Sequence, residues 1–423
     1  MQKSRLNLLI IFLNPLFISG IATELCGLTE KRNVVTSQIA IYNRLGVAVA
    51  SDTVSTITSV RGIKTINDSE KIRALGGEHL VVVLINGSAD INGMHPRLLV
   101  SEWARTLLTP LSTLEEYVEG FTSWFTQHQS LITKDLETIP IRFCLWDHYR
   151  EIRRRTLNDA KDLESAEEIR DNFLNKIQAG TAWLEGLSLY EGATDESDGA
   201  LLTEYEVDLD ALVDEVFNGF PNLDEVREHL KAAAPLVLSR SQEMSSDTEL
   251  AFIGFGANDR FAGQLCVRIR GRYGSSLRFT ADERYGSEPG ETSSGICTFA
   301  QDSAMTGFLW GAEEAVLRET FNSARNLIYE QYPDEETGTS KADEFVEKMR
   351  IATLSFQQQS FLQPMLNAIA FLNLKDMAKL AEALVGIQAM RASASPQPAS
   401  VGGFIESLII DRTNGIKWVN RLP

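Results

Sequence analysis

The stretch "VVTSQIAIYNRLGVAVASD", residues 34–52, decides how the rest of the sequence is interpreted. It contains two apolar runs, QIAIY and VAVAS, separated by NRLG. Short apolar runs on either side of a turn predict a β-hairpin, and Gly46 allows the backbone of that turn. Thr36 stands at the head of the first predicted strand, and Asp52 closes the second, sixteen residues later. The predicted hairpin therefore has a hydroxyl at the head of its first strand and a carboxylate at the end of its second.

Strand and helix patterns follow this hairpin in blocks. Short apolar runs bounded by turn residues predict strands, and they lie at 79–85, 249–256, 264–271 and 294–300. Apolar residues at three- and four-residue spacing predict helices, and they lie at 96–108, 114–125, about 302–332 and about 374–390. A second hairpin, with Asn414-Gly415 as its turn, ends the chain. Two antiparallel sheets packed face to face, with helices outside each, would bury every apolar face. We therefore predict an α+β fold, a four-layer αββα sandwich.

A charged, helix-rich block interrupts the pattern at residues 150–245. Within it, residues 185–228 contain 14 acidic residues and one basic residue, Arg227, which is typical of a solvated face. We interpret this block as an insertion or lid. Residues 36–149 and 246–423 are then the N-terminal and C-terminal halves of one domain.

The overall composition excludes several classes of function. With 40 Lys and Arg against 58 Asp and Glu, the net charge of −18 argues against binding to nucleic acid or to an anionic membrane surface. The four cysteines form no CxxC pair, and the five histidines form no HExxH motif. The sequence therefore predicts no disulfide framework, no metal site and no cofactor.

The N-terminal segment allows more than one interpretation. Lys3 and Arg5 precede an apolar run at 6–21, which resembles a secretory signal peptide that would end near residue 23. Asn14-Pro15 interrupts the run, which is too short for a membrane span. Residues 1–35 are therefore a signal-like segment, a propeptide, or an extension that arises from a mistaken start site, and we predict no stable membrane span.

Three motifs carry a resemblance to a known family. "TSQIAIYNRLGVAVASD", "SEKIRAL" and "LINGSAD" resemble the N-terminal half of proteasome β-type subunits and their bacterial peptidase relatives, which are N-terminal-nucleophile (Ntn) hydrolases with an αββα fold. The Thr-to-Asp spacing matches the family, and Lys71 comes three residues later than is usual. The Asn in the first hairpin and a late "VGG" are most similar to uncharacterised bacterial proteasome-like proteins.

The resemblance implies a role for each of these residues. Thr36 would be the nucleophile, and its own α-amine, with an ordinary pKa of about 8, would be the base. Lys71 would stabilise the developing alkoxide, and Asp52 would hold Lys71 charged and in place. A backbone N–H of Asn86 or Gly87 would form the oxyanion hole.

Some positions depart from the family pattern. Asn86 stands where the family has glycine. The resemblance implies that Ser88, the residue after the oxyanion turn, lines part of the substrate pocket. The auxiliary serines of the family correspond to Ser400 in "SVGG" and to either Ser294 or the "AQDS" at 300–303, and the sequence does not decide between the last two.

The nucleophile requires that the Val35–Thr36 peptide bond is absent from the mature protein, because the base is a free amine. Family members carry Gly before the Thr, whereas this chain has Val. Residues 1–35 would be removed by autocatalysis or with a signal peptide. Alternatively, translation starts at residue 35 from a valine codon, and removal of the initiator residue exposes Thr36.

The sequence leaves three possible functions open. The first is a cytoplasmic threonine-type peptidase acting on polypeptide or peptide-like substrates as a homo-oligomer, either a dimer or a ring. The second is a catalytically inactive proteasome-like scaffold or assembly subunit. The third is an exported small-molecule amidase, which would apply if residues 1–23 are a genuine signal peptide.

Overall fold

The opening hairpin forms the centre of a five-stranded antiparallel sheet. The structure is a computed structural model, which describes residues 36–59, 62–66, 69–88, 90–128, 132–159, 165–191, 193–220, 223–242, 244, 247–274, 276–286, 294–332, 335–395 and 401–422. The strand order is β11-β1-β2-β12-β13. The bounds are β1 (Ser37–Asn43), β2 (Gly46–Asp52), β11 (Ser294–Ala300), β12 (Ile405–Asp411) and β13 (Gly415–Asn420). Both predicted hairpins are therefore confirmed.

A second antiparallel sheet is built from the middle of the chain. Its order is β10-β8-β7-β6-β5, and β9 pairs with β8. The bounds are β5 (Ile72–Ala74), β6 (Leu80–Gly87), β7 (Thr248–Phe255), β8 (Gly263–Tyr273), β9 (Ser276–Ala281) and β10 (Tyr285–Gly286). A separate pair, β3 (Ser55–Ser59) and β4 (Gly62–Ile66), lies in sequence between β2 and β5.

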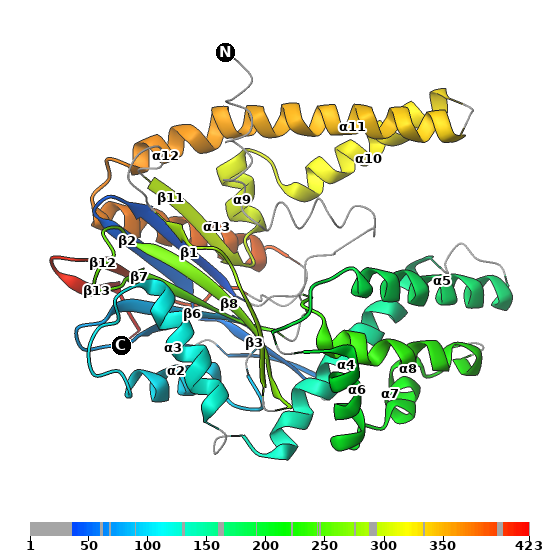
Figure 1. Ribbon diagram of the computed structural model, residues 1–423. Coiled ribbons are helices and arrows are strands. Elements are labelled where there is room, and N and C mark those ends of the chain that lie inside the picture. Colours follow the sequence, from blue (N-terminus) through cyan, green and yellow to red (C-terminus); the bar gives the residue numbers. More distant parts are fainter. Residues whose placement is uncertain are drawn as a thin grey trace, which may run out of the picture. The chain divides into compact units, whose positions relative to one another are not determined.

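One apolar cluster is shared by the two sheets. Tyr42 and Val49 of the first sheet belong to the same buried cluster as Leu84 and Ile253 of the second. Residues that alternate with these point to the other face of each strand. On the first sheet they pack with α9 (Ser303–Trp310) and α13 (Leu374–Ser393), and on the second with α2 (Pro96–Ala104) and α3 (Leu114–Gln127) (Figure 1). The predicted α+β class with antiparallel sheets is thus confirmed.

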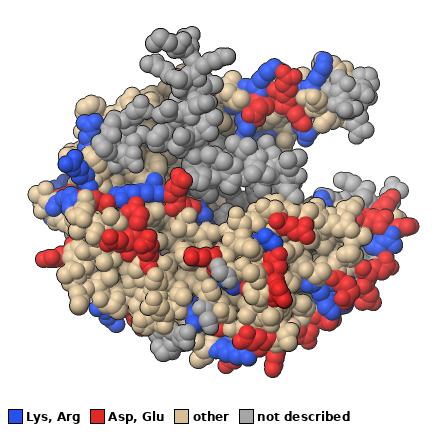
Figure 2. Space-filling view, in the orientation of Figure 1, with Lys and Arg blue, Asp and Glu red and all other residues tan. Residues whose placement is uncertain are grey.

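A block of helices stands where the sequence predicts an insertion. Its bounds are α4 (Lys134–Asp159), α5 (Ala166–Glu185), α6 (Asp195–Glu204), α7 (Leu209–Phe217) and α8 (Leu223–Ser239). These helices share a core of their own, which includes Tyr149, Phe173 and Leu230. Figure 2 shows acidic side chains gathered over this block, in agreement with the acidic run in the sequence.

The boundary that we placed between residues 149 and 150 falls inside α4. The sequence did not predict the start of this helix, because Pro140 lies inside it. Proline in a helix interior removes a hydrogen bond and normally argues against a helix. The ring of Pro140 lies against Gly271 of β8, where a Cβ atom would approach it to 2.7 Å. The helix therefore begins before residue 150, and the glycine provides the space for its proline.

The long helix predicted at about 302–332 is wrong as a single element. Gly311 adopts a left-handed conformation with φ of 76° and ends α9, after which α10 (Glu314–Gln331) begins. The sequence patterns also did not predict α11 (Glu335–Gln357), the π-helical turn η3 (Gln358–Leu362) or α12 (Gln363–Ile369). The helix predicted at about 374–390 is confirmed as α13.

Two predictions lie outside the described residues. These are the interpretations of residues 1–35 and the auxiliary role of Ser400. Among the residues that the structure does describe, no helix is both long enough and apolar enough to cross a membrane.

Candidate active site

Thr36 lies directly before β1, in the interior of the first sheet. Its side chain is buried, with 7% of the residue exposed. Its carbonyl oxygen accepts a hydrogen bond of 2.7 Å from the Gln301 N–H, just beyond the end of β11. The next residue, Ser37, pairs with Ala300 of β11. The backbone of Thr36 is therefore fixed from the β11 side.

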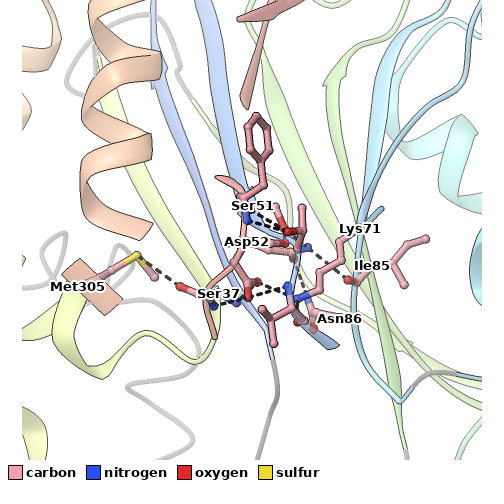
Figure 3. A network of polar contacts seen from close by, with 12 residues as sticks. Ser37, Ser51, Asp52, Lys71, Ile85, Asn86 and Met305 are labelled. Carbon is pink, nitrogen blue, oxygen red and sulfur yellow. Dashed lines mark hydrogen bonds and ion pairs between the residues drawn. The ribbon is translucent and has the colours of Figure 1, made fainter. Parts of the chain in front are cut away.

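Asp52 closes β2 and is fully buried. Its Oδ1 accepts hydrogen bonds from Lys71 Nζ at 2.7 Å and from the Ser37 N–H at 2.9 Å (Figure 3). Its Oδ2 accepts from the Gly402 N–H at 3.1 Å and from the Val54 N–H at 3.3 Å. Hydrogen bonds to an ionised acceptor are stronger than neutral ones. One carboxylate therefore joins the start of β1 to three other segments of the chain.

Lys71 lies one residue before β5 and is 4% exposed. Besides Asp52, its Nζ donates to the carbonyl oxygen of Val54. Its own carbonyl oxygen accepts a hydrogen bond of 2.9 Å from the Ile85 N–H of β6. The three-residue shift in its spacing leaves the contact with Asp52 intact, since the β3–β4 pair lies between them in sequence. The structure thus brings Lys71 and Asp52 together beside Thr36.

Burial shifts both members of this pair toward their neutral forms. Burial lowers the pKa of Lys71, and the attraction of Asp52 opposes this shift. Burial also raises the pKa of Asp52, against the opposing effects of Lys71 and of the Ser37 and Gly402 N–H groups. A lysine with a lowered pKa gives up its proton more readily than one on the surface. The site therefore contains a lysine with an unusual proton affinity next to the first residue of β1.

The predicted oxyanion turn lies at the end of β6. The Nδ2 of Asn86 donates to Glu249 Oε1 at 3.0 Å and to Gln38 Oε1 at 3.4 Å. The Ser88 N–H donates to the Asp247 carbonyl oxygen at 3.0 Å, just beyond the end of the β6–β7 ladder, so this amide is already bonded. A backbone N–H of Asn86 or Gly87 remains the prediction for the oxyanion donor.

Only glycine fits at position 87 of this turn. Its φ is +79°, a conformation that side-chain-bearing residues rarely adopt. A Cβ atom there would come within 2.4 Å of the Asp247 carbonyl oxygen. The glycine therefore allows β6 and β7 to approach where the oxyanion donor is predicted.

The structure decides which of the two candidates at 294–303 lies near Thr36. Ser294 pairs with Asn43, at the far end of β1, and its hydroxyl donates to the Leu366 carbonyl oxygen at 2.6 Å. Six residues of strand separate it from the start of β1, about 20 Å. The structure therefore does not bring Ser294 to Thr36. The alternative segment, 300–303, is the one that contacts the Thr36 backbone.

Several groups of this site carry no signal in the sequence. The Gly402 N–H reaches Asp52 from the "VGG" segment. Gln38 Nε2 donates to Ser51 Oγ at 3.3 Å and to the Ile85 carbonyl oxygen at 3.2 Å, which ties the two sheets together.

Two surface cavities are lined by residues outside this site. A cavity of about 530 Å³ is lined by residues of α2 and α3, among them Trp103, Glu119, Trp124 and His128. A smaller one, of about 280 Å³, lies beside the 76–79 turn. In the described ranges, no group of three His, Cys, Asp or Glu residues is arranged to hold a metal ion.

The buried Lys71–Asp52 pair can stabilise negative charge that develops near it. A buried ammonium group and a buried carboxylate share the oxygen that also binds the N–H of the residue after Thr36. Positive charge held in a low-dielectric site stabilises nearby negative charge far more strongly than it does in water. The position at the head of β1 is therefore suited to a group that becomes anionic.

No protein-family model matches the sequence, and no curated protein matches it.

Proposed function

We propose that this chain is an Ntn hydrolase that cleaves amide bonds, a threonine-type peptidase similar to proteasome β subunits. One observation carries the proposal, namely the buried Lys71–Asp52 pair bound to the first strand directly beside Thr36. The core shared by the two sheets and the helices packed outside them support the four-layer αββα architecture of that family.

In the proposed reaction, the Thr36 hydroxyl oxygen forms a bond to the substrate carbonyl carbon. The α-amine of Thr36 takes the hydroxyl proton and passes it to the leaving amine as the C–N bond breaks. Lys71 stabilises the negative charge on the threonine oxygen, and a backbone N–H at the Asn86-Gly87 turn stabilises the oxyanion. Water then hydrolyses the ester, and the α-amine again serves as the base.

The lysine and the carboxylate have distinct tasks in this scheme. Lys71 touches the reacting oxygen in the proposed transition state. Asp52 acts through Lys71 and through the Ser37 N–H, and it is therefore a positioning residue. The segment 300–303 contributes by holding the Thr36 carbonyl, which orients the nucleophile at the end of its strand.

The first test is the mature N-terminus. Intact-mass and N-terminal sequencing of the natively expressed protein should find Thr36 as the first residue. Residues 1–35 still attached to the purified protein would refute the role of Thr36.

The second test is covalent labelling with a peptide-like electrophile that reacts with hydroxyl nucleophiles. We expect a single adduct that maps to Thr36 and a loss of labelling of about 10³-fold or more in Thr36→Ala. Thr138→Ala removes an exposed hydroxyl in α4 and serves as the matched control, with labelling unchanged. Equal labelling of Thr36→Ala would remove Thr36 from the mechanism. A free Thr36 that takes no label would favour the inactive scaffold.

A further inference from the structure

The side chain of Gln38, two residues after Thr36, lies between the two sheets. Side chains two residues apart along a strand share a face. Ala40 and Tyr42 follow Gln38 at this spacing and belong to the apolar cluster that the two sheets share. Gln38 is fully buried. A buried amide destabilises an apolar layer unless its hydrogen bonds are made, so the partners of Gln38 show why an amide stands there.

Gln38 binds the strand that ends in the predicted oxyanion turn. Its Nε2 donates to the Ile85 carbonyl oxygen at 3.2 Å, and its Oε1 accepts from Asn86 Nδ2 at 3.4 Å (Figure 3). Ile85 and Asn86 are consecutive residues of β6, and Gly87 ends that strand. One side chain of β1 therefore holds both residues that precede Gly87.

The Gly87 N–H lies on the edge of β6 that Gln38 contacts. In an antiparallel sheet, the backbone groups of successive residues point to opposite edges of the strand. The Ser88 N–H donates to Asp247 on the β7 side, and the Ile85 N–H donates to Lys71 on the other side. The backbone groups of Gly87 therefore face the Lys71 side, like the Ile85 carbonyl that Gln38 binds. Gln38 thus acts beside the candidate oxyanion donor.

An ion pair fixes the orientation of both amides. Glu249 lies opposite Asn86 on β7 and pairs with Arg268 of β8 at 3.2 Å. An ionised carboxylate only accepts hydrogen bonds, so Asn86 Nδ2 faces Glu249 Oε1, at 3.0 Å. The second hydrogen of that Nδ2 is accepted by Gln38 Oε1. Gln38 is then left with its Nε2 toward the Ile85 carbonyl oxygen, so the bonds run in one direction from Arg268 to β6.

We propose that Gln38 is a positioning residue, which holds the Gly87 N–H at the distance from Thr36 that the oxyanion requires. This inference rests on the proposed function, in which Thr36 attacks a carbonyl carbon and a backbone N–H binds the carbonyl oxygen. The two groups belong to different sheets, and apolar packing between sheets has no direction. The hydrogen bonds of Gln38 do have one. A displacement of about 1 Å at such a site costs about 10²-fold in rate.

Two reagents test this inference on the natively expressed protein. With p-nitrophenyl acetate, Thr36 Oγ bonds to the acetyl carbon, an oxyanion forms, and p-nitrophenolate leaves. With methyl vinyl sulfone, the same oxygen bonds to the terminal alkene carbon and the hydroxyl proton goes to the neighbouring carbon, so that no carbonyl oxyanion forms. Intact mass and peptide mapping measure both reactions at Thr36.

Gln38→Met keeps the length of the side chain and removes its hydrogen bonds. It should lower the acylation rate by about 10²-fold and the alkylation rate by about 3-fold or less. Gln357→Met is the matched control, because Gln357 is 4% exposed and donates to the Trp310 carbonyl oxygen at 2.8 Å. It should change neither rate. If Gln38→Met does not fold, Asn86→Ala removes the same contact from the β6 side and should show the same difference between the reagents.

The other outcomes overturn the inference. Equal loss with both reagents in a folded variant would give Gln38 a merely structural role, and unchanged acylation would show that its bonds are not needed. A similar difference in Gln357→Met would show that the readout is not specific. A wild type that neither reagent modifies at Thr36 refutes the proposed function and this inference with it. Modification of Thr36 at the same ratio of rates in every variant refutes this inference alone.

Discussion

Replacement of Lys71 by methionine should destabilise the fold strongly at neutral pH. The substitution keeps the length of the side chain and leaves the fully buried Asp52 carboxylate without its cation. Loss of one partner of a buried ion pair costs about 3–5 kcal/mol, because the remaining charge is uncompensated. Three backbone N–H groups still bind Asp52, which places the expected cost near the lower end, at about 3 kcal/mol.

The cost should depend on pH with a definite sign. Burial already raises the pKa of Asp52 with Lys71 present, and removal of the cation raises it further. A group whose folded pKa lies above its unfolded value of about 3.9 favours folding while it is protonated. Its contribution is lost as the pH rises through the folded pKa. The variant should therefore be weakest at pH 8 and recover toward the wild type near pH 4–5.

Urea unfolding followed by circular dichroism at pH 8 and pH 5 measures this difference. The double variant Asp52→Asn/Lys71→Met removes both charges and should be more stable at pH 8 than Lys71→Met alone. Lys379→Met removes a lysine that is 72% exposed from its pair with Asp376, and it should cost about 0.5 kcal/mol or less. Equal stability of Lys71→Met and the wild type at pH 8, or a deficit independent of pH, would refute the reasoning.

Three further predictions concern other parts of the molecule. Gly46→Ala should destabilise the protein by about 3 kcal/mol in urea unfolding, because φ is +156° and the new Cβ would lie 2.1 Å from the Ile410 carbonyl oxygen. Burial lowers the pKa of His148 to about 4, so its contribution to stability is complete above pH 6.5 and lost as the pH falls toward 4. The wild type should lose about 3 kcal/mol more than His148→Phe over that range, and parallel losses would contradict this. Asp52→Asn should lower the rate of Thr36 labelling by about 10²-fold while the protein remains folded, and an unchanged rate would show that Asp52 has no positioning role.

The two terminal hairpins were predictable because their turns and apolar runs are local. "NRLG" and Asn414-Gly415 determine where the chain reverses, and the strands on either side are short and apolar. α11 was not predictable in the same way. The partly buried Val346 and Met349 and the exposed Phe345 and Phe356 are all apolar. The apolar residues of α11 therefore do not mark one face of a helix in the sequence.

The candidate site, too, was predictable only in part. The meeting of Asp52 and Lys71 followed from the family resemblance, and the structure places the two side chains 2.7 Å apart. The Gly402 N–H and the Val54 carbonyl were beyond prediction, because every residue has these groups and only the fold selects which ones reach the site. The choice between Ser294 and the segment 300–303 was open in the sequence, because the register of β11 along β1 sets their distances from Thr36, and a motif carries no register.

β1 is paired on both of its edges, by β2 and by β11. Chain ends normally fray, and an end that must act at each turnover would have to be ordered anew each time. A chain that starts at Thr36 would instead start inside a sheet, between Gln301 on one side and the Asp52 carboxylate on the other. The ordering entropy of about 1–2 kcal/mol per residue would then be spent once, during folding. A loss of the segment before Thr36 would expose an end that the Gln301 N–H and the Asp52 carboxylate already hold in place.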